Sequence, residues 1–210
     1  MKTASDFLSE AERLEQLWAG DFGDAYRERN ANASNGRAPF WNDLLSRHPA
    51  RRVLEVGCNI GANLRWIMER VPPREVYGVD ISEHALQHLR ASLSSVNTLW
   101  SPARSLPFRD NWFDLVFTAG VLIHQPETTL PLVMAEVVRC ARQYVLCMEY
   151  FSEATITVPY RGQSHALFKR NYGGIYQELF PELELRETGD LEPEQGWDNV
   201  TYWLFTKNAS

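Results

Sequence analysis

The sequence predicts an α/β fold with a mostly parallel sheet, because short apolar runs alternate along the chain with segments of helical spacing. The runs are rich in Val, Leu, Ile and Phe and contain few polar residues, which is typical of parallel strands that are buried on both faces. The expected strands are residues 53–56, 76–79, 96–100, 113–117, 144–148, 183–188 and 200–206. The amphipathic segments between them predict helices that pack on the sheet, so a layered α/β domain is expected.

The composition of the 210-residue chain limits the class of protein. Apolar residues make up 44% of it, which suffices for one good core, so we expect a helical cap over 1–50 on a single unit over 51–210. The net charge of -6 argues against a nucleic-acid surface, which would need a basic face. With an odd number of cysteines and no signal-peptide pattern in residues 1–6, we expect no disulfide framework and a cytoplasmic protein. Neither membrane contact nor a metal site is expected.

Residues 55–61, Glu-Val-Gly-Cys-Asn-Ile-Gly, join the first expected strand directly to a helix. Gly57 and Gly61 let the backbone turn sharply and approach a bound group. Asp80 ends the next apolar run, where its carboxylate is placed to accept hydrogen bonds from both hydroxyls of a ribose. Together, the glycine turn and the acid predict an adenosine-containing ligand.

Two positions in the same turn indicate which adenosine cofactor binds. The dinucleotide fingerprint G-x-G-x-x-G needs glycine where this chain has Asn59 and Ala62, so a pyrophosphate would meet a side chain there. S-adenosylmethionine has no phosphate and is commonly held by a looser loop of the form E/D-x-G-C-x-x-G, which residues 55–61 match. It is therefore the expected cofactor, and a nicotinamide dehydrogenase is the disfavoured alternative.

The remaining segments are interpreted from their spacing and from the residues that break it. Residues 3–48 show helical spacing and are expected to form helices that cover a cofactor cleft. Ser82 is expected to cap the next helix, and residues 101–108 to pass over the carboxyl edge of the sheet. Residues 150–162 are expected to be loop-like or extended, and residues 169–180 to form a helix.

The motifs, in this order, resemble class I S-adenosylmethionine-dependent methyltransferases of small molecules. The resemblance rests on residues 53–61, 77–82, 106–108, 113–116 and 121–124. It implies a Rossmann-like fold, with a mostly parallel seven-stranded sheet flanked by helices and an N-terminal helical lid. More narrowly, residues 22–30, 57–61, 149–151, 160–162 and 167–170 are similar to the family labelled pseudaminic acid biosynthesis-associated methylases.

The same resemblance implies a cofactor site. Ile81 would cover one face of the adenine, Ala103 would lie near its edge, and Thr118 would lie near the methionine amino group. Many relatives have an acid just before this alanine, whereas this chain has Pro102, so the adenine edge is left to backbone or to Arg104. The expected cofactor-binding residues are Tyr26, Arg29, Glu55, Gly57, Asn59, Gly61, Asp80, Ile81, Ala103 and Thr118.

Methyl transfer from a sulfonium is an in-line displacement, so the protein mainly aligns two reactants and excludes water. An acceptor that must lose a proton needs a base. The candidates at the carboxyl edge are His124, Glu149, Tyr150, Tyr160 and His165, of which His124, Glu149 and Tyr160 are the expected catalytic residues. His124 is the best placed because it comes directly after the fourth parallel strand, and the alternative is a histidine that only holds the loop.

A cluster of donors after the fifth parallel strand predicts the charge of the acceptor. Arg161 offers a bidentate fork to a carboxylate or phosphate, and the alternative is a solvated basic turn paired with Glu178 or Glu182. The expected acceptor-binding residues are Tyr26, His124, Tyr150, Arg161, His165, Lys169 and Arg170. We therefore expect N- or O-methyl transfer to a small polar, anionic metabolite such as a sugar acid, an amino acid or a natural-product intermediate. A cofactor-binding subunit or sensor without turnover is the alternative, and the oligomeric state stays open.

Overall fold

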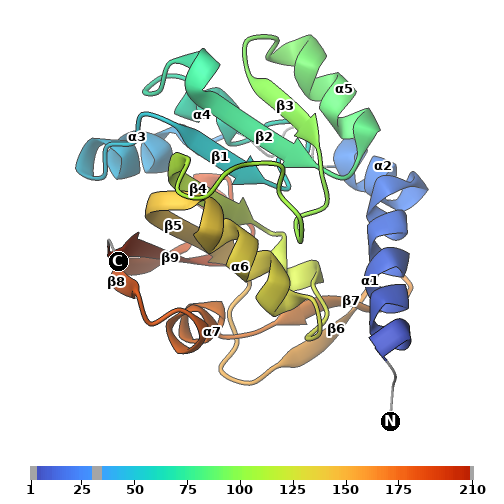
Figure 1. The fold of residues 1–210 in the computed structure, drawn as a ribbon. Helices are drawn as coiled ribbons and strands as arrows, with labels where there is room; N and C mark the ends of the chain where they lie inside the picture. Colours follow the sequence, from blue (N-terminus) through green and yellow to red (C-terminus); the bar gives the residue numbers. More distant parts are fainter. Residues whose placement is uncertain (1–3, 30–34, 209–210) are drawn as a thin grey trace.

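The computed structural model describes residues 4–29 and 35–208, and the side chains of residues 4–9, 27–29 and 164–165 lie outside that description. A seven-stranded sheet forms its centre, in the order β3-β2-β1-β4-β5-β9-β8 (Figure 1). Its strands are β1 Val53–Val56, β2 Val76–Asp80, β3 Asn97–Trp100, β4 Phe113–Ala119, β5 Ala141–Glu149, β8 Leu183–Leu191 and β9 Val200–Lys207. Strands β1 to β5 are parallel to one another, whereas β9 is antiparallel to β5 and β8. The prediction of a mostly parallel seven-stranded sheet is confirmed.

The strand order reverses at the centre of this sheet. Strand β1 pairs with β2 on one side and with β4 on the other, although β2 and β3 come between β1 and β4 in the sequence. The connections that leave the carboxyl ends of β1 and β4 therefore run in opposite directions and open a crevice between them. A ligand site is expected at that edge.

Residues of the central strands alternate between two buried faces. Val116 of β4 packs on one face and Phe117 on the other, and Val145 and Leu146 of β5 do the same. The first face is covered by α6 Leu130–Cys140 and α7 Tyr172–Leu179, and the second by α3 Ala38–Arg47, α4 Leu64–Ile67 and α5 Glu83–Ser92. Because helices cover both faces, the strands are continuous apolar runs in the sequence.

The start of α5 agrees with the prediction from the sequence, and the start of α7 differs from it. Ser82 caps α5 as predicted, because its Oγ accepts a hydrogen bond from the backbone N–H of Ala85 at 3.2 Å. The helix predicted over 169–180 begins later, at Tyr172, where the Asn171 side chain accepts from the N–H of Gly174 at 2.9 Å. Lys169 ends a strand instead, so the expectation that it opens a helix is wrong.

Residues 156–169 form a two-stranded hairpin that the sequence did not reveal. Strand β6 Ile156–Tyr160 pairs antiparallel with β7 Gln163–Lys169. The turn between them is made by Arg161 and Gly162, whose φ angles of 49° and 80° are both left-handed. A tight turn with two left-handed residues matches the twist of a hairpin, and this explains why a segment expected to be loop-like or extended becomes paired.

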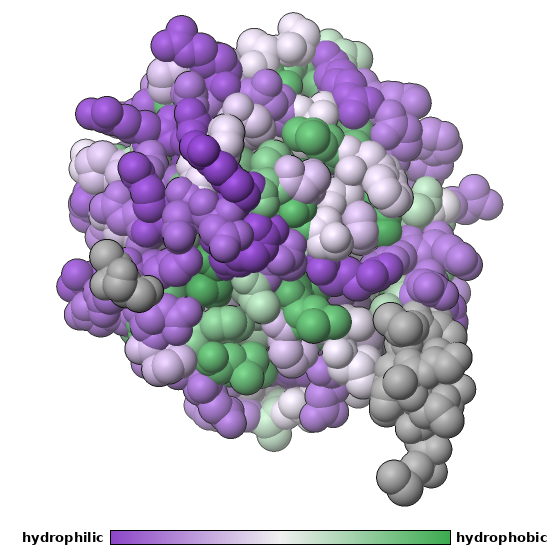
Figure 2. Space-filling model, viewed as in Figure 1, coloured by the Kyte–Doolittle hydropathy of each residue, from purple (hydrophilic) through white to green (hydrophobic). Residues whose placement is uncertain are grey.

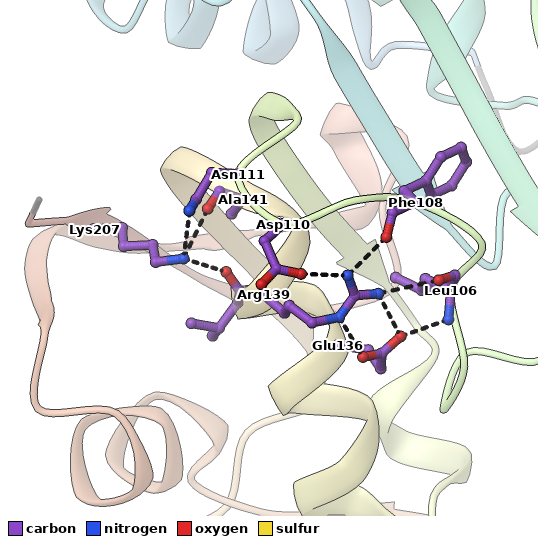
Figure 3. Close-up of polar contacts among 9 residues, drawn as sticks. Leu106, Phe108, Asp110, Asn111, Glu136, Arg139, Ala141 and Lys207 are labelled. Carbon is purple, nitrogen blue, oxygen red and sulfur yellow. Dashed lines mark hydrogen bonds and ion pairs between the residues drawn. The ribbon is translucent and has the colours of Figure 1, made fainter. Parts of the chain in front are cut away.

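Arg139 of α6 fixes the loop between β3 and β4 (Figure 3). Its guanidinium donates to the carbonyl oxygens of Leu106 at 3.0 Å and Phe108 at 2.7 Å. It also pairs with Asp110 at 2.8 Å and with Glu136 at 2.6 Å. Because buried carbonyl groups need hydrogen-bond donors, the Arg139 side chain holds the β3–β4 loop in place. The residues of this loop that precede Leu106 reach the carboxyl edge of the sheet.

Two N-terminal helices, α1 Ala4–Ala19 and α2 Asp21–Arg29, stand along one side of the molecule (Figure 1). Arg104 Nε donates to Glu15 Oε1 at 2.6 Å and joins α1 to the β3–β4 loop. The Asp24 carboxylate lies 2.8 Å from Nδ1 of His84 and joins α2 to α5. These contacts place both helices against the carboxyl edge of the sheet.

Figure 2 shows hydrophilic side chains over most of one face of the molecule. Hydrophobic side chains form small groups on this face, and Leu132 of α6 and Leu179 of α7 are among the exposed ones of the protein. Within residues 4–29 and 35–208, no helix is both long enough and apolar enough to cross a membrane.

Candidate active site

A cavity of about 210 Å³ lies at the carboxyl edge of the sheet, beside the ends of β1, β2, β4 and β5. Helix α1 contributes Trp18, α2 contributes Tyr26, and the β8–β9 loop contributes Trp197 and Asp198. The predicted site residues that line it are Tyr26, Glu55, Gly57, Asn59, Asp80, Ile81, Ala103, His124 and Tyr150. Those that do not line it are Gly61, Thr118, Glu149, Tyr160, Arg161, Lys169 and Arg170. The predicted side chains of Arg29 and His165 lie outside the described residues.

The glycine turn brings backbone to the cavity wall. Gly57 has φ of 75°, and its N–H donates to the carbonyl oxygen of Val79 at 2.8 Å. A Cβ atom there would lie 2.3 Å from Cγ2 of Val121, so only glycine fits. Gly61, with φ of 76°, instead makes room for Leu89 of α5, where a Cβ would come within 2.5 Å of Cδ1. Gly61 therefore allows the turn to pack against α5 and does not itself line the cavity.

The Asp80 carboxylate is held in one orientation at the end of β2. Its Oδ2 accepts from the N–H of Asn59 and its Oδ1 from the N–H of Ser82, both at 2.8 Å. Burial raises the pKa of this carboxyl, and the backbone donors act in the opposite direction. Each oxygen can accept a second hydrogen bond, so the side chain can bind a pair of hydroxyls without moving.

Glu55 is a buried carboxylate on β1 with one unsatisfied oxygen. Its Oε1 accepts from Nδ2 of Asn63 at 2.6 Å, whereas Oε2 is buried without a hydrogen-bond partner in the described part of the chain. Burial raises the pKa of Glu55 to about 8. An unpaired carboxylate oxygen at a cavity wall suits a bound ammonium group, and this is the observation that fits the amino group of S-adenosylmethionine.

Arg37 is a cavity residue that the sequence interpretation missed. Its guanidinium donates to Oδ1 of Asn63 at 2.9 Å and to the carbonyl oxygen of Gly196 at 2.8 Å, and it lies 4.1 Å from the ring centroid of Trp197. The partners are distant in sequence, so no local spacing could identify the contact. Arg104, suggested for the adenine edge, is paired with Glu15 of α1.

Glu149 holds a loop beside the cavity and does not line the cavity itself. Its Oε1 accepts from the N–H groups of Val121 and Leu122 at 3.1 Å, and its Oε2 accepts from the N–H of Ile123 at 3.2 Å. The side chain is fully buried, and burial raises its pKa to about 7 against the effect of these donors. Glu149 therefore fixes the short helix η2 Leu122–His124, and its geometry supports positioning rather than the predicted role as a base.

His124 is buried at the cavity wall in a defined tautomer. Its Nδ1 lies 2.6 Å from the carbonyl oxygen of Ala166, and because a carbonyl only accepts, Nδ1 carries the hydrogen and Nε2 keeps a lone pair. The Trp18 ring lies 4.2 Å from the imidazole, centroid to centroid. Burial lowers the pKa of His124 to about 4, so the ring is neutral near pH 7.

The predicted donor cluster of the hairpin does not assemble around the cavity. Arg161 is exposed at the turn, and Tyr160 packs with ring centroids 5.8 Å from His124 and 5.9 Å from Phe22. Arg170 is buried and donates to the carbonyl oxygen of Gln125 at 2.9 Å. These positions indicate a structural role for Arg170 and give no support to an anion grip by this cluster.

Comparisons with known proteins agree with this geometry. Residues 53–143 match a family model described as a methyltransferase domain. An uncharacterised methyltransferase of Schizosaccharomyces pombe is 33% identical over 109 residues, which cover 47% of this chain and 39% of that protein. Demethylmenaquinone methyltransferase of Staphylococcus aureus is 30% identical over 172 residues, covering 74% of this chain and 71% of that protein.

A solved structure extends the likeness to the whole chain. The Burkholderia thailandensis 1,6-didemethyltoxoflavin-N1-methyltransferase, with bound 1,6-didemethyltoxoflavin and S-adenosylhomocysteine, superposes with a TM-score of 0.71 at 16% identity. The match covers 100% of this chain and 92% of that one. The chain belongs to the class I S-adenosylmethionine-dependent methyltransferases, and S-adenosylmethionine is its cofactor.

The role of Glu149 gives a prediction about stability. In Glu149→Gln, an amide NH2 replaces one of the oxygens that accept from Val121, Leu122 and Ile123, so at least one buried N–H loses its partner. The free energy of unfolding should fall by about 1–3 kcal/mol, measured by chemical denaturation. Glu178→Gln, on the exposed side of α7, is the matched control and should stay within about 0.5 kcal/mol of the native protein. Equal stability of the two variants would contradict the loop-holding role.

Proposed function

We propose that this protein transfers a methyl group from S-adenosylmethionine to a nitrogen or oxygen atom of a small polar molecule. The observation that carries the proposal is that one cavity joins the cofactor-type carboxylates Glu55 and Asp80 to a neutral histidine, His124. Four carboxylates and two guanidinium groups line this cavity, and the chain has a net charge of -6. This excess of acid supports a small-molecule acceptor over a nucleic acid.

In the proposed site, Asp80 binds the ribose hydroxyls and Ile81 and Ala103 border the adenine. The unpaired Oε2 of Glu55 accepts from the amino group of the methionine portion, and Arg37 provides the nearby positive charge for its carboxylate. The backbone of Gly57 and Asn59 lies beside the methionine portion of the cofactor in this proposal. The cofactor supplies an electrophilic methyl group on a sulfonium.

His124 is proposed to orient the acceptor. The N–H of Nδ1 is engaged by Ala166, so Nε2 accepts a hydrogen bond from the O–H or N–H that will be methylated. Because the imidazole is neutral, it can take up the proton that the acceptor releases. Glu149 contributes by fixing the backbone of η2, and Tyr160 by packing against the imidazole.

The N-terminal helices are proposed to act as a lid over residues 51–210. Trp18 and Tyr26 extend from α1 and α2 to the cavity, and the Glu15–Arg104 and Asp24–His84 contacts hold these helices in place. In this position the aromatic side chains would limit the access of water, which competes with the acceptor and screens the charges.

A direct experiment separates an enzyme from a cofactor-binding sensor. Methyl-labelled S-adenosylmethionine is incubated with the protein and a small-molecule extract of cells, and labelled products are found by mass spectrometry. A labelled product that depends on the protein and on His124 supports the proposal. Cofactor binding without any labelled product would favour the sensor.

Asp80 gives the first prediction for the proposed site. Asp80→Asn keeps the size of the side chain and removes the charge that strengthens two hydrogen bonds, so cofactor affinity should fall roughly 10- to 100-fold. Calorimetric titration with S-adenosylhomocysteine measures it. Asp190→Asn, on β8 and away from the cavity, is the control and should bind normally. Unchanged affinity in a folded Asp80→Asn protein would remove Asp80 from the site.

The raised pKa of Glu55 predicts proton release on cofactor binding. With a pKa of about 8, Glu55 is mostly protonated at pH 7 in the ligand-free protein. An ammonium group beside it favours the carboxylate, so binding at pH 7 should release about one proton. Calorimetry in buffers of different ionisation enthalpy counts it, and Glu55→Gln should abolish the release. Equal release by both proteins would place the cofactor ammonium elsewhere.

The geometry of His124 predicts a selective loss of turnover. His124→Gln replaces the imidazole with an amide that cannot take up a proton, so kcat should fall about 10²–10⁴-fold at saturating cofactor, with little change in cofactor affinity. In the native enzyme, the limb of the pH profile caused by His124 should lie near pH 4, with activity lost as the pH falls through that value. His88→Gln, exposed on α5, is the control. Normal turnover of His124→Gln would make His124 a loop residue.

A further inference from the structure

The wall of the cavity beyond the proposed cofactor contacts indicates what kind of acceptor enters. This inference rests on the proposed function, since it assigns Asp80 and Glu55 to the cofactor. Besides small and apolar residues, the remaining wall includes Trp18 of α1, Tyr26 of α2, Tyr150 after β5 and Asp198 of the β8–β9 loop. It is therefore an aromatic surface with one carboxylate at its rim.

The charges of the cavity favour a cation on this side. Glu15 and Arg104 neutralise each other in an ion pair. The guanidinium of Arg37 donates its hydrogen bonds to Asn63 and Gly196 and lies against Trp197, and its charge also acts on Asp198 without a hydrogen bond between the two. Among the described residues that line the acceptor side, Asp198 is left as the charged group without an opposite charge in hydrogen-bond contact. An acceptor with a carboxylate or phosphate here would be repelled by it.

Burial keeps the two tyrosines in their neutral form. It is the main cause that raises the pKa of Tyr26 to about 12; the neighbouring Tyr160 and Asp198 act in the same direction, and Arg37 acts against them. Burial, followed by the charge of Asp198, also raises the pKa of Tyr150, whose hydroxyl donates to Oδ2 of Asp198 at 3.5 Å. Both phenols therefore stay neutral near pH 7, and neutral aromatic rings attract cations to their faces. Lys169 shows this for Tyr150, because its Nζ lies 5.7 Å from that ring.

We propose that the acceptor is an amine, which enters the cavity as an ammonium ion and is held between the carboxylate of Asp198 and the aromatic faces of Trp18, Tyr26 and Tyr150. Aromatic faces combined with a carboxylate are the recognition chemistry of ammonium groups. The arrangement replaces the anion grip that the sequence indicated, because Arg161 and Lys169 do not line the cavity.

Transfer to an amine balances with the groups present. The ammonium first loses a proton, which passes to water at the rim or to Nε2 of His124 and on to solvent. The nitrogen lone pair then forms the N–CH3 bond while the S–CH3 bond breaks, and that electron pair stays on sulfur as a neutral thioether. The product is a methylated amine and S-adenosylhomocysteine, with no oxidant or further reactant needed.

The experiment sorts acceptors by their charge. A small-molecule extract is divided at pH 7 on cation- and anion-exchange resins into retained cations, retained anions and an unretained neutral fraction. Each fraction is incubated with the protein and methyl-labelled S-adenosylmethionine. We expect label in the fraction retained by the cation exchanger, in an N-methylated product. Label confined to the anionic or neutral fraction would overturn the amine acceptor while leaving the methyltransferase proposal intact. No label in any fraction, with the cofactor bound, would overturn the proposed function and this inference with it.

Variants then test the residues of the acceptor side on the labelled amine. Asp198→Asn should raise its KM about tenfold and leave the affinity for S-adenosylhomocysteine unchanged. Glu194→Gln is the matched control, because it removes a charge from the same loop outside the cavity. Tyr26→Leu should also raise KM, since it removes an aromatic face. Equal KM values for Asp198→Asn and the control, or a loss of cofactor affinity in Asp198→Asn, would overturn the assignment of Asp198 to the amine.

A non-reactive cation provides an independent measurement. Tetramethylammonium has no lone pair and cannot accept a methyl group, so it should inhibit competitively against the amine at millimolar concentration. Sodium chloride at the same ionic strength is the control for screening, and tert-butanol for size. Inhibition by tert-butanol equal to that by tetramethylammonium would show that the pocket selects apolar volume and would contradict the proposed recognition of charge.

Discussion

The placement of three carboxylates at the edge of one sheet, two of them buried and one partly buried, is the constraint on which the rest of this structure depends. Glu55, Asp80 and Glu149 lie on β1, β2 and β5, and each needs donors because a buried charge without partners is costly. The chain that follows supplies them for Asp80 through Asn59 and Ser82, and for Glu149 through the backbone of η2. The carboxylates at the strand ends thus fix the conformation of the loops that follow. This coupling explains how loops can hold the residues of a site in place. Glu55 differs, because its Oε2 has no hydrogen-bond partner in the described part of the chain. A ligand that donates a hydrogen bond to this oxygen would be stabilised there.

The parts that the sequence predicted are those in which a local pattern has a physical cause. Apolar runs buried on both faces identify parallel strands, and the glycine at position 57 is needed because Val121 packs against it. Asp80 and the cap residue Ser82 follow from their places at a strand end and a helix start. Each of these features depends on neighbours in the chain or on the shared edge of a parallel sheet, so one sequence suffices to find them.

The parts that the sequence did not predict depend on contacts between distant segments. The position of Arg37 is set by Gly196 and Trp197, and Trp18 of α1 contacts His124, which is far from it in the sequence. The helix was predicted to begin at Lys169 and begins at Tyr172 for a local reason. Asn171 caps the helix with its side chain, and the residues before it pair in the hairpin. A cluster of basic residues in the sequence is therefore weak evidence for a binding site until its backbone is placed.

The electrostatics of the cavity connect the fold to the chemistry. In the proposed complex Glu55 has lost its proton, so Glu55, Asp80 and Asp198 outnumber Arg37 around the sulfonium, because Glu15 and Arg104 pair with each other. A positively charged cofactor therefore relieves part of the burial penalty of these carboxylates, and that relief contributes to its binding. In the proposed reaction, transfer of the methyl group would move positive charge from sulfur toward the side of the cavity where Asp198 and the tyrosines lie. Burial makes His124 a weak base and keeps its imidazole neutral. A neutral imidazole does not repel the positive charge as that charge moves from sulfur toward the acceptor.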